Sequence, residues 1–282
     1  MVSSGYSQTP VSLGLQTCAF QAFVGLHRAP KRQKRSQHTL EANLKAQNIL
    51  ANLHPASRPT DDDVLQVLDM MDLEKTKRRK NVTRPEQVQA GGIISVSLAL
   101  VRNKITKGLQ VSTKTAEMRD VCMLLGRWAC IDGVDAVPFT SMTLNKDYNA
   151  GRHRDENNSG PSLVRGLGNF QGGDLLYWPN DPHGSIASLK ESDACVCDVR
   201  NCFVPILGRC AHEVTPFTGT RYSIVFYCVE GWKGAEDSVR QILELSGFRW
   251  PTPYSNLQMQ ARVDYAYAKG SAGSQIAGCT EA

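Results

Sequence analysis

The segment that ends in His153-Arg154-Asp155 most constrains this chain, because it places an imidazole and a carboxylate two residues apart after a strand-like run. At a strand end, side chains i and i+2 point to the same face, so both groups can bind one metal ion. His212 is the natural third ligand, since a Pro/Gly turn and an apolar strand follow it. Two histidines and one carboxylate leave coordination positions open, an arrangement that suits non-haem Fe(II). The sequence therefore predicts a metal site.

A second feature follows His212 at the start of the apolar strand. Arg221 and Ser223 share one face of this strand. A buried arginine needs an anion, and its planar fork fits a carboxylate with two parallel hydrogen bonds. The Ser223 hydroxyl can donate a further hydrogen bond. The pattern predicts a carboxylate-binding site, and pairing of Arg221 with an acidic residue of the protein is the structural alternative.

Taken in order, these motifs resemble the Fe(II)/2-oxoglutarate-dependent oxygenase superfamily: His153-x-Asp155, Gly172-Gly173-Asp174-Leu175, His212 and Arg221-x-Ser223. The resemblance covers about residues 140–229 and implies a mixed α and β fold, with a double-stranded β-helix (jelly-roll) core and supporting helices outside. It also implies the cofactor Fe(II), the cosubstrate 2-oxoglutarate and O2. On this resemblance, His153, Asp155 and His212 bind the iron, and Arg221 and Ser223 bind 2-oxoglutarate. Asn145 and Tyr148 resemble further cosubstrate-contacting positions.

Within the superfamily, three segments resemble the ten-eleven-translocation and J-binding-protein branch, which oxidises pyrimidine methyl groups in nucleic acid. They are the Asn-rich approach to His153, the segment 170–175 and Gly219-Thr220-Arg221-x-Ser223. We therefore expect 5-methylcytosine or thymine as the substrate, with phosphate-facing residues at Lys146, Arg152, Arg154 and Arg165. Two alternatives stay open. One is a protein (prolyl-type) or small-molecule hydroxylase, and the other is an inactive β-helix module that binds a partner without turnover.

The positive charge of the chain is concentrated near its N-terminus. Residues 1–90 hold 13 Lys or Arg and 8 Asp or Glu, whereas residues 91–282 hold 19 of each. Basic runs at 31–35 and 75–80 can contact phosphates or act as a nuclear address, or they form a solvated tail and a helix end. These runs favour a nucleic-acid partner and a nuclear, intracellular location. The sequence indicates no oligomeric state.

The cysteines and the hydropathy pattern also point to an intracellular protein. The nine cysteines have no regular framework spacing, which favours reduced thiols. Cys195-Val196-Cys197 lacks the paired spacing of a structural zinc site. No apolar run reaches the roughly 18 residues of a membrane span, so we expect no membrane partner.

The coarse pattern predicts one catalytic domain over residues 39–250, after a flexible basic extension at 1–38 and before a tail at 251–282 with disordered last residues. Within the domain we expect helical support over 39–135, the β-helix core over about 136–230 and a C-terminal helix over 235–247. Leu40, Leu44, Ile49 and Leu53 predict the apolar face of a first helix. Thr60 predicts the N-cap of a second helix over 61–73. Further elements are a strand at 93–101, a helix at 113–131, and strands at 140–149, 174–178, 194–199, 202–207 and 221–229.

Overall fold

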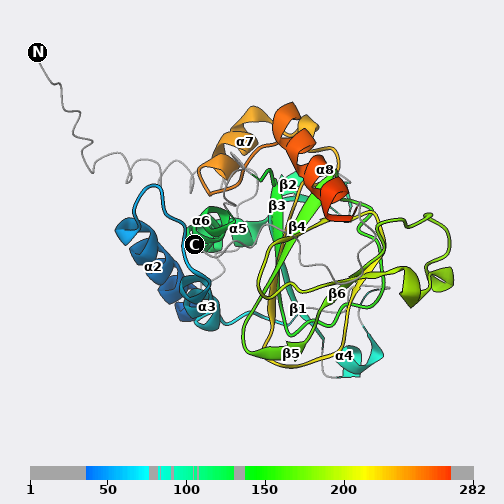
Figure 1. Cartoon of the computed structure of the whole chain (residues 1–282). Helices are drawn as coiled ribbons and strands as arrows, with labels where there is room; N and C mark the ends of the chain where they lie inside the picture. The colour runs from blue at the N-terminus through cyan, green and yellow to red at the C-terminus, as the bar shows by residue number, and fades with distance from the viewer. Residues whose placement is uncertain are drawn as a thin grey trace, which may run out of the picture.

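A computed structural model describes residues 36–75, 82, 84–89, 92–103, 105–106, 108–129 and 137–267. Two antiparallel sheets form the centre of this part of the chain, and a group of helices lies along one side of them (Figure 1). The mixed α and β composition predicted from the sequence is therefore confirmed. The division of the chain into an extension, a domain and a tail stays a prediction.

The larger sheet has six strands in the order β2-β1-β3-β11-β4-β8, and all neighbouring strands are antiparallel. Alternation along the strands divides its side chains between two faces. Leu144 on β3 and Ile224 on β11 face the helices, whereas Asn145 and Ser223 point to the opposite, inner face. The strands are β1 (Ile94–Arg102), β2 (Leu109–Val111), β3 (Ser141–Lys146), β4 (Pro161–Leu167), β8 (Val204–Leu207) and β11 (Tyr222–Tyr227).

A second sheet, in the order β7-β6-β9, packs against the inner face of the larger one. The two sheets meet in a buried cluster that includes Val164 of β4, Ile206 of β8 and Tyr177 of β6. A two-stranded ladder, β10-β5, lies beside them. The strands are β5 (Phe170–Gly172), β6 (Leu175–Tyr177), β7 (Cys195–Cys197), β9 (His212–Val214) and β10 (Phe217–Gly219). The interior between the two sheets is where the predicted metal ligands lie.

Helices cover the outer face of the larger sheet and bury the main apolar core against it (Figure 1). Leu124 and Leu125 of α6 and Val67 and Leu68 of α3 are fully buried there. The helices of this group are α2 (Gln37–Asn52), α3 (Asp61–Asp69), α5 (Thr113–Glu117), α6 (Arg119–Trp128), α7 (Asp237–Glu244) and α8 (Pro253–Tyr267). The short α4 (Pro85–Gln89) lies apart from them, near β5 and β6 (Figure 1), and short 3-10 turns occur at Ile186–Ser188, Glu191–Asp193 and Trp232–Gly234.

The cap predicted at Thr60 is confirmed, and it begins α3. The Thr60 hydroxyl accepts from the Asp63 backbone N–H at 3.1 Å, and the Asp63 carboxylate accepts from the Thr60 N–H at 2.9 Å. This reciprocal pair satisfies two donors that a helix start leaves open. The helix ends at Asp69, four residues before the predicted end at 73.

The first helix also forms, as α2, and the predicted apolar face is confirmed only in part, because Ile49 packs against the main core but Leu40 and Leu44 do not. Leu40 and Leu44 are 43% and 59% exposed, whereas Ala42, Asn43 and Ala46 are buried. Small side chains let α2 approach α6 closely, and Asn43 binds the end of α5 through the carbonyl oxygen of Glu117 and the start of α6 through the N–H of Asp120. Close packing and the hydrogen bonds of Asn43, and not the spacing of the leucines, therefore decide which face of α2 is buried.

An unpredicted helix lies within the segment 251–282 that the sequence assigns to the tail. Residues 253–267 form helix α8, which buries Met259 and Val263 and reaches the cluster between the sheets through Tyr267. The sequence did not indicate this helix, because its amphipathic pattern is weak and only every fourth residue, Ser255, Met259 and Val263, is buried. Residues 268–282, like the extension up to residue 35 and the basic runs at 31–35 and 76–80, lie outside the described residues.

The predicted strands at 93–101, 140–149, 174–178, 194–199, 202–207 and 221–229 are confirmed as β1, β3, β6, β7, β8 and β11, and the predicted C-terminal helix is α7. The helical prediction at 113–131 is met by α5 and α6. Strands β2, β4, β5, β9 and β10 were not predicted, because polar residues, glycine or proline interrupt their patterns. In the described part of the chain, no helix is both long and apolar enough to cross a membrane.

Candidate metal centre and carboxylate site

The backbone brings the two predicted histidine ligands side by side. His212 opens β9, and His153 lies in the loop between β3 and β4. The two residues form an isolated antiparallel bridge in which each N–H donates to the other's carbonyl oxygen at 3.0 Å. Asp155 is fixed separately, because its N–H donates to the carbonyl oxygen of Gly208 at 2.7 Å. Three ligands from two distant segments are thus held by main-chain hydrogen bonds.

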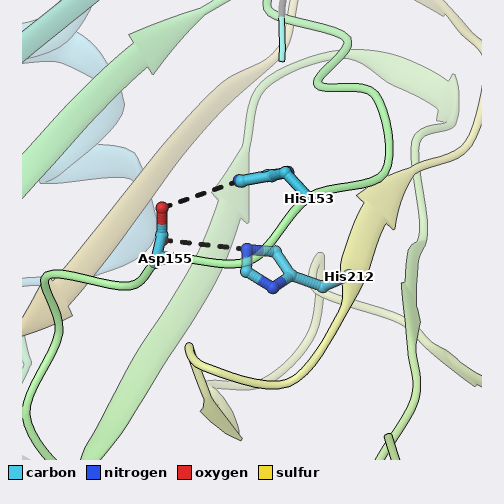
Figure 2. Close-up of side chains that lie close together, drawn as sticks. All are labelled: His153, Asp155 and His212. Carbon is cyan, nitrogen blue, oxygen red and sulfur yellow. Dashed lines mark ion pairs between the residues drawn. The ribbon is translucent and has the colours of Figure 1, made fainter. Parts of the chain in front are cut away.

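The three side chains converge, as Figure 2 shows. Asp155 Oδ1 lies 3.7 Å from His153 Nε2, and its Oδ2 lies 3.8 Å from His212 Nε2. One ligand atom from each residue lies within 4.8 Å of the other two. Both histidines are less than a tenth exposed, while the Asp155 side chain is 23% exposed. The site is thus enclosed on the histidine side and open on the carboxylate side.

Each histidine is held in the tautomer that a metal ligand needs. His153 Nδ1 lies 2.8 Å from the carbonyl oxygen of Gly151, and His212 Nδ1 lies 2.9 Å from that of Cys210. A carbonyl oxygen can only accept, so Nδ1 carries the hydrogen in both rings. Each Nε2, which lies within 3.8 Å of an Asp155 carboxylate oxygen, then carries the lone pair. Such backbone contacts are the usual way in which metal-binding imidazoles are oriented.

The donor set fits a divalent transition metal. Two neutral imidazole nitrogens and one carboxylate on one side of an ion form the arrangement that non-haem Fe(II) enzymes use, with positions left for other ligands. His153, Asp155 and His212 form the only such group of three that the described residues contain. The residues predicted from the sequence are therefore the ones that the fold brings together.

Arg221 is the second notable group in this interior. It is 1% exposed, and its guanidinium lies 5.4 Å and 5.5 Å from the ring centres of Phe170 and Phe217. Its Nε is buried without a hydrogen-bond partner, and no acidic residue in the described part of the chain forms an ion pair with it. Burial lowers the pKa of the guanidinium to about 10, against the opposing effect of the Asp174 charge. This is a desolvated cation between two aromatic rings, which favours an anionic ligand.

Of the other residues predicted to bind the cosubstrate, Asn145 and Ser223 share the inner face with Arg221, whereas Tyr148 lies beyond the end of β3. Ser223 pairs with Asn145 across β11 and β3, and Asn145 Nδ2 donates to Ser223 Oγ at 3.2 Å. The hydroxyl hydrogen of Ser223 is thereby left for another acceptor. Tyr148 is buried in a small cluster with Ile93, Ala150 and Val214. Asn145 and Ser223 together offer polar groups inside the fold, and both are 6% exposed.

Gly173 explains how the buried guanidinium is accommodated. Its φ is +71°, and a β-carbon at this position would stand 2.9 Å from Arg221 Nε, closer than real β-carbons approach. The residue stands just before β6, whose partner β9 begins with His212. Val214, on the same face of β9 as His212, pairs with Leu175 of β6. Arg221 therefore lies beside the segment that leads into β6, and β6 pairs with the strand that carries the candidate ligand His212.

Arg152 and Arg154, predicted to face phosphate, are instead bound to the protein. Arg152 donates to the carbonyl oxygen of Leu189, pairs with Glu213 and lies over the ring of Trp178 at 4.2 Å. Arg154 forms two hydrogen bonds of 2.6 Å with the Asp181 carboxylate. Their adjacency to His153 suggested a role at the substrate, but the loop after β6 folds back and accepts hydrogen bonds from both side chains.

Lys146 and Arg165 lie on the wrong face of the larger sheet for the predicted role. Arg165 lies on the same face of β4 as Leu163 and Leu167, which is the face toward the helices. It forms an ion pair with Asp61 of α3. Lys146 is aligned with Tyr222, and its Nζ lies 5.0 Å from that ring. Alternation along β3 and β4 points both side chains away from the metal ligands. The sequence did not reveal which face of each strand the helices cover.

One residue near the metal ligands was missed altogether. Asp181 is 7% exposed and accepts hydrogen bonds from both segments that carry the candidate metal ligands. In the sequence it stands in Asn180-Asp181-Pro182-His183-Gly184, which is typical of an exposed turn. The local sequence gives no sign that Asp181 is buried, because its partners Arg154 and Ala211 lie 27 and 30 residues away.

The arrangement defines a protein with a candidate metal centre and a candidate anion site between two antiparallel sheets. No protein-family model and no curated protein match this chain. Solved structures similar to it include "NgTET1 in complex with 5mC DNA", with 13% identity, a TM-score of 0.36, and coverage of 75% of this chain and 99% of that one.

Two further solved structures are similar. One is an oxidoreductase of the 2OG-Fe(II) oxygenase family from Burkholderia pseudomallei, with 16% identity, a TM-score of 0.35, and coverage of 71% of this chain and 91% of that one. The other is a Pseudomonas putida prolyl-4-hydroxylase, with 17% identity, a TM-score of 0.27, and coverage of 62% and 97%. The neighbours thus include the superfamily that the motifs resemble.

Proposed function

We propose that this protein is an Fe(II)- and 2-oxoglutarate-dependent dioxygenase with a double-stranded β-helix core, and that it oxidises a pyrimidine methyl group, of 5-methylcytosine or thymine, in nucleic acid. One observation carries the reaction class. A buried guanidinium without an ion-pair partner among the described residues lies beside Gly173, which leads into β6, and β6 pairs with β9, the strand that carries His212 of a two-histidine, one-carboxylate triad. A metal site alone fits many activities, but a metal site beside a carboxylate receptor fits an oxo-acid cosubstrate.

Different residues would bind the iron and the cosubstrate. His153 and His212 would hold Fe(II) through Nε2, and Asp155 would hold it through its carboxylate. Arg221 and the hydroxyl of Ser223 would hold the distal carboxylate of 2-oxoglutarate. Phe170 and Phe217 exclude water around the guanidinium, which strengthens its attraction for the anion. When bound, the iron supplies the redox chemistry by which 2-oxoglutarate, O2 and a substrate C–H bond become succinate, carbon dioxide and an alcohol.

The substrate proposal has a different basis. It is supported by the motif resemblance and by the positive charge of residues 1–90. It receives no support from Lys146, Arg152, Arg154 and Arg165, whose side chains are engaged elsewhere. Hydroxylation of a protein or of a small molecule is therefore the outcome against which the nucleic-acid proposal is tested.

The test uses the purified full-length chain. Under anaerobic conditions, Fe(II) followed by 2-oxoglutarate should produce a metal-to-ligand charge-transfer band. With O2 present, succinate and oxidised products are then measured by mass spectrometry on methylated DNA, thymine-containing DNA, RNA and a peptide mixture. Oxidised pyrimidine supports the proposed substrate, whereas a peptide heavier by one oxygen atom supports the protein hydroxylase. If neither the band nor succinate is detected, the proposed reaction is overturned in favour of an inactive binding module.

A further inference from the structure

We propose that Asp181 is a positioning residue that ties together the two chain segments carrying the metal ligands. This inference rests on the proposed metal centre. The segment 153–155 and the segment that begins at His212 meet at one backbone bridge, between His153 and His212. Asp181, in the turn that follows β6, makes a second connection between the same segments through its side chain.

The Asp181 carboxylate is fully used by four donors. Oδ1 accepts from Arg154 Nη2 at 2.6 Å and from the His183 N–H at 2.8 Å. Oδ2 accepts from Arg154 Nε at 2.6 Å and from the Ala211 N–H at 2.7 Å. A carboxylate offers about four acceptor sites, so its hydrogen-bonding capacity is filled. The Asp181 side chain has no exposed surface, and that of Arg154 is 14% exposed.

The positions of these donors give Asp181 its effect on the metal site. Arg154 stands between the ligands His153 and Asp155, and Ala211 immediately precedes the ligand His212. One carboxylate oxygen, Oδ2, accepts from both segments, so any movement of one segment relative to the other must break or stretch a charged hydrogen bond. The backbone bridge holds His153 and His212 together. The contacts of Asp181 with Arg154 also restrain the chain between His153 and Asp155.

The surrounding turn is itself anchored. The N–H of Trp178 donates to the carbonyl oxygen of Ala211 at 3.0 Å, and the N–H of Asp181 donates to that of Trp178 at 3.2 Å. Arg154 also donates to the carbonyl oxygen of Gly184 at 2.9 Å, on the far side of the turn. Its Arg154 partner holds the pKa of the Asp181 carboxyl down at about 2, so the carboxylate is charged at neutral pH.

The experiment is a titration of metal-free, full-length protein with Co(II), followed by visible absorption and by competition with a chelator. Asp181→Asn and Arg154→Gln should each bind Co(II) about 10–100-fold more weakly than the wild type, the usual effect of losing a contact that orients metal ligands. Arg154→Gln leaves the bonds from Ala211 and His183 to Asp181 in place, so it decides the question if Asp181→Asn does not fold.

Two control variants separate positioning from stability. Glu244→Gln removes an exposed ion pair with Arg240 on α7, and Leu243→Ala removes a fully buried side chain from the same helix. Both should bind Co(II) as the wild type does, although Leu243→Ala lowers the free energy of unfolding. Wild-type affinity in both Asp181→Asn and Arg154→Gln overturns the role of Asp181 and leaves the metal centre standing. A loss of Co(II) affinity in Leu243→Ala equal to that in Asp181→Asn also overturns this role, because it would be an effect of lower stability. If the wild type binds no Co(II), the proposed function fails together with this inference.

Discussion

His153 and His212 face each other across one antiparallel bridge, and the Nδ1 of each ring forms a hydrogen bond with the carbonyl oxygen two residues before it in the sequence. The same local geometry thus occurs twice, with the ring centres 4.2 Å apart. Main-chain hydrogen bonds fix both rings before any ion binds. A metal centre built in this way loses little conformational entropy on binding.

Removal of a triad ligand should abolish tight metal binding. We expect His212→Gln to weaken Co(II) binding by more than about 100-fold, since a lost ligand costs more than a lost contact to a ligand. Isothermal titration of the metal-free protein measures this. His38→Gln, which changes an exposed histidine of α2, serves as the matched control. Equal affinities in the two variants would exclude His212 as a ligand.

Arg221→Met should weaken 2-oxoglutarate binding by roughly 1.5–3 kcal/mol, the value of a hydrogen bond to a charged group. In the wild type, 2-oxoglutarate should raise the thermal midpoint, because a ligand that binds only the folded state stabilises it. That increase should disappear in Arg221→Met and persist in Arg240→Met, which changes an exposed arginine of α7.

The same Arg221→Met variant should keep its stability in the absence of 2-oxoglutarate. A buried guanidinium without an ion pair is costly, and an apolar side chain of similar length between Phe170 and Phe217 removes that cost. Chemical unfolding without cosubstrate measures this. A loss of several kcal/mol would show that Arg221 has a structural partner.

The Asp181 carboxylate should stabilise the fold in a pH-dependent way. Its folded pKa of about 2 lies below the usual 3.8, so its contribution is present above pH 3.8 and is lost as the pH falls toward 2. The shift corresponds to about 2 kcal/mol. Urea unfolding of the wild type and Asp181→Asn should therefore differ at pH 6 and converge as the pH falls below 4. A constant difference would contradict this account.

The bridge between α2 and α6 should depend on Asn43 and not on the leucines. Asn43→Ala leaves the Asp120 N–H and the Glu117 carbonyl oxygen without this partner, and should cost about 1–3 kcal/mol. Leu44→Ala, at a position that is 59% exposed, should cost less than about 0.5 kcal/mol. Thermal or urea unfolding compares the two variants directly, and the reverse order would restore the leucine face predicted from the sequence.

Arg165→Gln should act on stability and not on substrate. Its guanidinium pairs with Asp61 beneath the helices, on the face opposite to Asn145 and Ser223. We expect a loss of about 1–3 kcal/mol in unfolding free energy, with an unchanged salt dependence of nucleic-acid binding, since a phosphate contact would alter that dependence. A shallower salt dependence in this variant would place Arg165 at the phosphate after all.

Sequence alone identified the candidate ligands of the site. His153, Asp155 and His212 were identifiable because metal ligation demands particular side chains, and their i, i+2 spacing and strand context appear in the local pattern. Arg221 was identifiable for the same reason, as a charge on an apolar strand. The cap at Thr60 and the stronger strands were also predictable, since each depends on neighbouring residues.

Tertiary structure decided what surrounds that chemistry. Whether Arg154 meets a phosphate or Asp181, and whether Arg165 faces the interior or α3, depends on which distant segment packs against each strand. The same holds for the buried face of α2 and for helix α8. Ligand identity is a local property of side chains, but the partner of a long cation is set by burial and by contacts far apart in the chain, which local periodicity does not encode.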